Sequence, residues 1–162
     1  MIKITPEKNN TPQSHNSSYV TWTVDASPDY SDGDQVGDIE AFAILTENDG
    51  TITIESLTII DDDKLNFDVD VLIFDSQPTV TSSDNGALAM TVANLQKCRA
   101  RIRVRECDWS ELDGQSIADV TVGRAIKGAN GDTNLYVALQ ARGDINFVLT
   151  GGVSVALNSL RP

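Results

Sequence analysis

Histidine, cysteine and long apolar runs are scarce in this 162-residue chain, and each shortage narrows the possible chemistry. The single histidine, His15, lies in a polar stretch, which removes most arrangements that use histidine as a catalytic base or zinc ligand. No segment approaches the ~18 apolar residues of a membrane-spanning helix, and residues 1–10 lack the apolar core of a secretory signal. The sequence leaves open whether Cys98 and Cys107 pair. We therefore expect no enzymatic activity, no cofactor and no metal site.

Positive charge is also scarce. The chain has 12 Lys and Arg residues and 24 Asp and Glu residues, which gives a formal net charge of −12. Nucleic-acid binding needs a basic surface that contacts phosphates, and anionic membranes attract basic rather than acidic segments. We expect neither as a partner. Asp outnumbers Glu by 18 to 6. Since Asp favours turns and Glu favours helices, this bias predicts many loops and few helices.

Alternation of apolar and polar residues predicts an all-β fold, a β-sandwich or jelly-roll-like domain of eight or nine strands. The predicted strands cover residues 19–24, 39–45, 51–60, 65–74, 99–105, 117–126, 135–142, 147–149 and 153–157. At most one short helix is expected, within residues 87–97, with Thr91 as its cap. Residues 1–18 are polar and predict a flexible N-terminal arm, so a single β-sandwich domain would occupy residues 19–162.

Two local signals concern the strand at residues 51–60. The residues that precede it, Asn48, Asp49 and Gly50, are typical of a hairpin turn. Within the strand, the alternation changes phase near Ser56, which indicates a β-bulge.

The acidic run at residues 61–63 consists of three consecutive aspartates. It lacks the spaced aspartates, central glycine and closing glutamate of an EF-hand. We interpret it as a solvated acidic turn.

A stripe of arginines is the most informative charged feature, and its members are Arg99, Arg101, Arg103 and Arg105. Period two places all four on one face of a strand, where like charges repel. A solvated outer face and a nucleic-acid contact are alternatives. We prefer pairing with carboxylates, on a neighbouring strand or across a subunit contact, with Asp68 and Asp70 as candidates. These six residues and Trp109 are the candidate interface residues, and Trp22 and Trp109 are interpreted as core or interface anchors.

Four segments together resemble a family of small virion proteins of tailed phages. They are residues 30–37 (YSDGDQVG), 71–79 (VLIFDSQPT), 83–87 (SDNGA) and 135–143 (LYVALQARG). In that family, patterns similar to YxxGDxxG, LFxSxPT, DNAAF and LYxxLxxRG recur at similar separations. The resemblance spans residues 19–157, and departs from the family where an aromatic residue is usual, at residues 86–88.

The resemblance implies a phage capsid decoration or cement protein, a homotrimer that binds the major capsid protein on the outer surface of the head. It would be made in the host cytoplasm and would have no catalytic site. Another virion component, from a tail, baseplate or fibre and with a carbohydrate-binding face in some cases, is the alternative. The segments themselves have scaffold features: Gly33 and Gly37 fit turn conformations that other residues resist, and residues 84–86 fit a tight turn.

Overall fold

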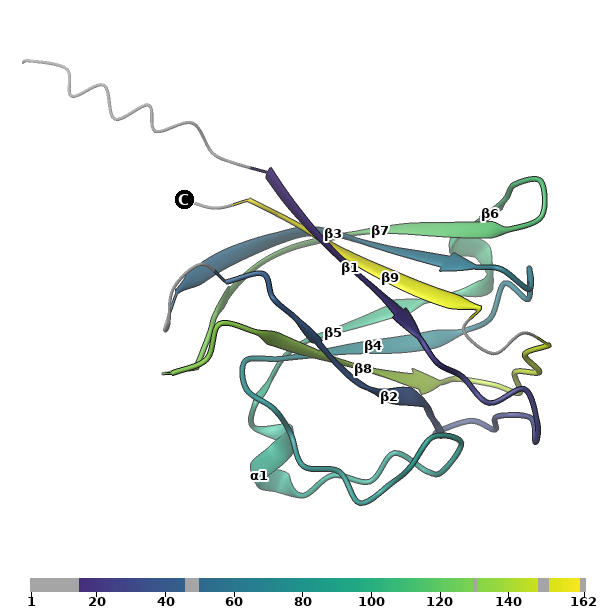
Figure 1. The fold of residues 1–162 in the computed structure, drawn as a ribbon, viewed down its shortest axis with the longest axis horizontal. Coiled ribbons are helices and arrows are strands. Elements are labelled where there is room, and N and C mark those ends of the chain that lie inside the picture. Colours follow the sequence, from purple (N-terminus) through teal and green to yellow (C-terminus); the bar gives the residue numbers. More distant parts are fainter. Residues whose placement is uncertain (1–14, 46–49, 130, 149–151, 161–162) are drawn as a thin grey trace, which may run out of the picture.

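A computed structural model describes residues 15–45, 50–129, 131–148 and 152–160, and within them nine strands form two antiparallel sheets (Figure 1). The five-stranded sheet has the order β1 (His15–Trp22), β9 (Val153–Leu160), β3 (Thr51–Asp61), β7 (Ser116–Lys127) and β6 (Trp109–Glu111). The four-stranded sheet has the order β2 (Gln35–Phe42), β8 (Leu135–Ala141), β4 (Val69–Phe74) and β5 (Cys98–Val104). The all-β fold class is confirmed, as a two-sheet sandwich.

The main core lies between the two sheets and follows from the alternation along each strand. On β4, Val69, Val71 and Ile73 are fully buried and belong to the main core cluster. Trp22 at the end of β1 and Phe42 at the end of β2 join the same cluster, with ring centroids 5.9 Å apart. These aromatic side chains connect the two layers at the β1 and β2 side of the sandwich.

A second apolar layer covers part of the outer face of the four-stranded sheet. Leu72 and Phe74 of β4 point away from the main core but are buried beneath residues 76–97, which run below the sheet in Figure 1. Leu88 and Met90 of this segment pack on them. The segment does not cover the whole face. The edge at β5, which carries the arginines, is therefore the more open part of this face.

The predicted hairpin before β3 is wrong. β2 pairs with β8 in one sheet, whereas β3 pairs with β7 and β9 in the other, so the chain crosses between sheets here. The turn residues Asn48 and Asp49 lie outside the described residues. The predicted bulge is confirmed, because the pairing of β3 shifts register between Ile54 and Ser56.

Several other elements differ from the prediction. The helix α1 is a single turn, Val92–Leu95, although its cap Thr91 is confirmed by a side-chain bond from the Asn94 amide. Phe147 and Val148 are not in a strand, and Leu149 lies outside the described residues. Phe147 is instead a buried core residue that contacts the rings of Tyr30 and Phe67 from a loop, so its apolar character reflects packing rather than strand formation.

The N-terminal boundary also moves. β1 begins at His15 and pairs with β9 along its whole length, so the last four residues of the predicted arm belong to the sandwich. Residues 1–14 lie outside the described residues. In the described part of the chain, no helix is long and apolar enough to cross a bilayer.

Candidate functional site

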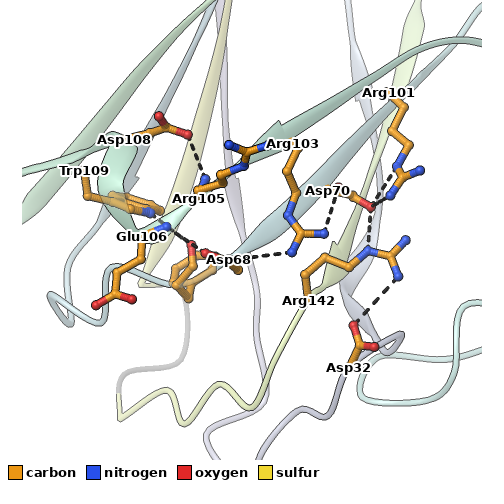
Figure 2. Close-up of polar contacts among 11 residues, drawn as sticks. Asp32, Asp68, Asp70, Arg101, Arg103, Arg105, Glu106, Asp108, Trp109 and Arg142 are labelled. Atoms are coloured by element: carbon orange, nitrogen blue, oxygen red, sulfur yellow. Dashed lines mark hydrogen bonds and ion pairs between the residues drawn. The ribbon is translucent and has the colours of Figure 1, made fainter.

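Three arginines of the stripe, Arg99, Arg101 and Arg103, lie on β5, the edge strand of the four-stranded sheet, and Arg105 directly follows it. The side chains of Arg101 and Arg103 reach Asp70 on the neighbouring strand β4 (Figure 2). The pairing register places Arg103 opposite Asp70 and Arg101 opposite Leu72. Guanidinium groups on β5 can therefore reach the carboxylates at residues 68 and 70 across the strand pair. The predicted pairing on a neighbouring strand is confirmed, and the arginines are not simply a solvated row.

Asp70 is the centre of the cluster. Its side chain is fully buried, and its Oδ2 accepts hydrogen bonds from Arg101 Nε at 2.8 Å and from Arg142 Nε at 2.5 Å. Arg103 Nη1 lies 3.6 Å from the other oxygen, Oδ1. One carboxylate thus contacts three guanidinium groups, of which Arg101 keeps 58% of its side chain exposed.

Asp68, a third exposed, links the stripe to the chain beyond β5. Its Oδ2 accepts a bond from Arg103 Nη2 at 3.0 Å, and its Oδ1 accepts one from the Glu106 amide at 2.7 Å. Burial alone would raise the pKa of Asp68. The bonds from Arg103 and Glu106 stabilise the charged form more strongly, so the pKa is lowered.

The two ends of the stripe differ. Arg99 pairs with Asp75, a mostly buried carboxylate just after β4. Arg105 has an exposed side chain, and its backbone amide donates to Asp108. Across the gap to the other sheet, Arg124 of β7 donates from Nη1 to the Arg99 carbonyl at 2.8 Å.

Trp109 lies beside this cluster but is used mainly within the chain. Its indole Nε1 donates to the Phe67 carbonyl at 2.9 Å, and the two rings have centroids 5.1 Å apart. The side chain is half-buried against the core. Its place at a contact between copies stays a prediction.

The first and third resembling segments meet in space around Tyr30. The fully buried Tyr30 donates from its hydroxyl to Asp84 Oδ1 at 2.6 Å, and the same oxygen accepts from the Gly37 amide at 2.6 Å. Burial and the bond to Asp84 raise the pKa of the Tyr30 hydroxyl well above its ordinary value. These hydrogen bonds join the first and third segments in the interior of the protein, which is a structural role.

Two glycines of the first segment have the backbone conformation expected of them. Gly33 has φ +97° and Gly37 has φ +63°. A Cβ at residue 37 would lie only 2.5 Å from Trp22 Cδ1, whereas a Cβ at residue 33 would meet open space.

The fourth resembling segment contributes Arg142 to the arginine cluster. Besides Asp70, Arg142 contacts the Gln140 side chain through Nη2, and its Nη1 lies 3.8 Å from Asp32. Sequence reasoning did not select Arg142, Asp75 or Arg124 as site residues. Arg142 and Asp75 stand in resembling segments, which was the one signal available, while no periodicity joins Arg124 to the stripe.

The acidic run does not behave as a solvated turn throughout. Asp61 is fully buried, and its carboxylate accepts bonds from the amides of Asp63, Leu65 and Asn66. Burial raises the pKa of Asp61, although these amide bonds act in the opposite direction. Within the described residues, no group of three or more His, Cys, Asp or Glu side chains is arranged to hold a metal ion.

The remaining reactive side chains are the two thiols, which are not bonded to each other. Cys98 is half-buried at the start of β5, and Cys107 is exposed after it. Burial raises the pKa of the Cys98 thiol, which disfavours its nucleophilic thiolate form.

The most distinctive chemical feature of the surface is a set of oriented guanidinium groups, which are suited to binding carboxylates.

Comparison with known proteins adds no identity. No protein-family model matches the chain, and no curated protein is significantly similar to it. The class that the fold defines is therefore an acidic two-sheet β-sandwich with an arginine-rich edge.

Proposed function

We propose that this protein is a non-enzymatic decoration or cement protein of a tailed-phage head. It would bind the major capsid protein on the outer surface as a homotrimer. The proposal starts from the resemblance of residues 30–37, 71–79, 83–87 and 135–143 to small virion proteins.

The observation that carries the proposal is the ordered, exposed arginine surface at β5. The buried carboxylates Asp70 and Asp75 hold Arg101 and Arg99, whose side chains remain 58% and 48% exposed. Guanidinium groups fixed in this way lose little conformational entropy when a partner binds. A domain that presents such a surface suits repeated protein–protein contacts, as a coat protein requires.

The acidic character of the chain supports the same role. A net charge of −12 on each copy gives a coated particle a strongly negative outer layer. Such a layer keeps particles apart and disfavours non-specific association.

The experiment is a copy-number measurement on purified virions, with heads and tails separated. Band or peptide intensity relative to the major capsid protein should give on the order of hundreds of copies, all in the head fraction, as a lattice with many equivalent positions requires. A few copies in the tail fraction would contradict the head assignment. Absence from both fractions would contradict a virion role altogether.

A tail or baseplate component with a carbohydrate-binding face is the second candidate, favoured by one feature. A pocket of about 500 Å³ lies beside β4 and is lined largely by polar side chains, namely Asn66, Asp68, Glu106, Arg142, Asp144 and Asn146. The Oδ1 atom of Asn66 is buried without a hydrogen-bond partner. Binding to a panel of host glycans, lost in Asn66→Ala, would favour this alternative.

A further inference from the structure

Charge is distributed very unevenly along the chain. Residues 9–63 contain 12 acidic residues and no Lys or Arg, whereas the rest of the chain contains 12 acidic and 12 basic residues. The formal net charge of −12 therefore belongs entirely to residues 9–63.

Among the described residues, three of the four exposed acids of this segment lie at one edge of the sandwich. β1 and β2 are edge strands of their respective sheets, and they lie together because Trp22 Nε1 of β1 donates to the Asp38 carbonyl of β2 at 2.9 Å. We call this surface the acidic edge, and its exposed members are Asp25, Asp29 and Asp38. The fourth exposed acid, Asp32, lies 3.8 Å from Arg142 of the arginine cluster.

The arginines lie at the opposite edge. β5 is at the other end of the four-stranded sheet from β2, and it adjoins β7 through the Arg124–Arg99 hydrogen bond. A groove of about 380 Å³ between β5 and β7 is lined by Arg101, Arg103 and Arg124. We call this surface the basic edge, and its members are Arg99, Arg101, Arg103, Arg105 and Arg124.

We infer that the basic edge of one copy binds the acidic edge of the next copy, head to tail. The inference rests on the self-association in the proposed function and assigns the surfaces that produce it. A two-fold contact through the basic edge would place arginines against arginines, and a contact through the acidic edge would place carboxylates against carboxylates. Like-charge repulsion across the interface opposes both contacts. The head-to-tail arrangement joins opposite charges and closes into a ring when the rotation between copies permits.

Edge-strand chemistry supports the same assignment. Charged side chains on an edge strand block pairing with an identical edge, so β5 of one copy is protected from β5 of another. An acidic edge is not excluded in this way, because its carboxylates accept hydrogen bonds from the arginines. The occupant of the groove is therefore a second copy of this chain.

Two charge-reversal variants test the contact. The first, Arg105→Glu with Arg124→Glu, alters the basic edge and leaves the ion pairs of Asp70 and Asp75 in place. The second, Asp29→Lys with Asp38→Lys, alters the acidic edge at exposed side chains. Light scattering at micromolar concentration should show that each variant alone loses the association of the wild-type protein. The quadruple variant that combines all four reversals should regain it, because each copy then carries glutamates at one edge and lysines at the other.

The controls are Lys64→Glu and Asp113→Lys, single reversals at exposed turn positions outside both edges. They should associate as the wild type does, and circular dichroism should show that every variant is folded. Wild-type association should weaken between about 0.1 M and about 1 M salt, as the screening length falls from ~10 Å to ~3 Å.

Several outcomes would overturn the inference. Unchanged association in both double variants would do so, as would a folded quadruple variant that stays dissociated. A wild-type monomer that binds heads through Arg105 and Arg124 would assign the basic edge to the capsid protein. It would leave the head assignment of the proposed function intact and contradict the homotrimer. Restored association in a protein absent from heads would support the contact and contradict the proposed function.

Discussion

Asp70 is the residue on which the arginine surface depends most. Its carboxylate is fully buried, yet Arg101, Arg103 and Arg142 all reach it from partly exposed positions. A buried charge of this kind is stable only because its partners compensate for the lost hydration. Removing it would leave three guanidinium groups in mutual repulsion.

We predict that Asp70→Asn lowers the free energy of unfolding by about 2–3 kcal/mol. Loss of one partner from a buried ion pair costs about 3–5 kcal/mol, and the partial exposure of the arginines reduces that cost. Urea denaturation measures the change. Asp144→Asn removes an exposed carboxylate in the loop after β8 and should stay within about 0.5 kcal/mol of the wild type. Equal stability of the two variants would mean that Asp70 does not organise the cluster.

Asp68 gives the fold a pH dependence of known sign. Its pKa is lower in the folded chain than in the unfolded chain, so the folded state binds fewer protons. The stability that it contributes is fully present above the unfolded-state pKa of about 3.9 and is lost as the pH falls through the folded-state pKa. Asp61, whose pKa is raised by burial, acts in the opposite direction, so acid unfolding of the whole chain mixes both effects.

The comparison of wild type with Asp68→Asn isolates the Asp68 contribution. We predict that the difference in unfolding free energy is largest above about pH 4 and shrinks toward zero in more acidic solution. Denaturation at a series of pH values provides the measurement. A difference that is independent of pH would show that the ion pair with Arg103 contributes nothing through its charge.

At the scale of elements, the packing of strand β1 against strand β2 depends on the small size of Gly37. Its φ of +63° and the position of Trp22 leave no room for a side chain. We predict that Gly37→Ala destabilises the protein by about 3 kcal/mol, because a left-handed backbone costs ~1–2 kcal/mol for alanine and forced overpacking adds ~1–3 kcal/mol.

Gly33→Ala is the matched control for Gly37→Ala. Residue 33 also has a positive φ, but its Cβ would meet nothing within 4 Å. Only the backbone cost of about 1–2 kcal/mol should remain. Thermal or urea unfolding of both variants separates the two contributions, and equal losses would argue against the contact with Trp22.

The alternation of apolar and polar residues predicted most strands. In a sandwich, each strand has one face toward the core and one toward solvent, so the alternation can be read from the local sequence. It failed where long-range packing decides the structure. Turn residues before β3 indicate that the chain turns, but they cannot indicate which sheet the next strand joins, and β3 pairs with strands far along the sequence. Residues 87–90 have the composition of a helix. They are not helical, and Leu88 and Met90, two residues apart, both pack on β4.

The arginine cluster was predictable in part for the same reason. Period two placed the stripe on one face of β5, and the acidic residues of β4 were its nearest candidates. Arg142 and Asp75 could not be added from the sequence, since their approach depends on the order of β8, β4 and β5 in the sheet. The buried state of Asp61 was missed because a run of aspartates carries no signal for which one the backbone amides enclose.

At the scale of the whole molecule, exposed arginines lie at one edge of the sandwich and exposed aspartates at the other, within a strongly acidic chain. This polarity gives each copy a direction, which an assembly of identical subunits can use to order itself. A coat of such copies would present the acidic surface that remains outside the contacts. Association between copies and attachment to the head are separable properties, and each has its own measurement above.

The proposed role itself is tested most directly by a density map of the intact virion at a resolution that resolves β-sheets. We expect a two-sheet sandwich of this chain at regularly repeated positions on the outer surface of the head, in contact with the major capsid protein. Density for the chain only in the tail or baseplate, or its complete absence from the particle, would contradict it.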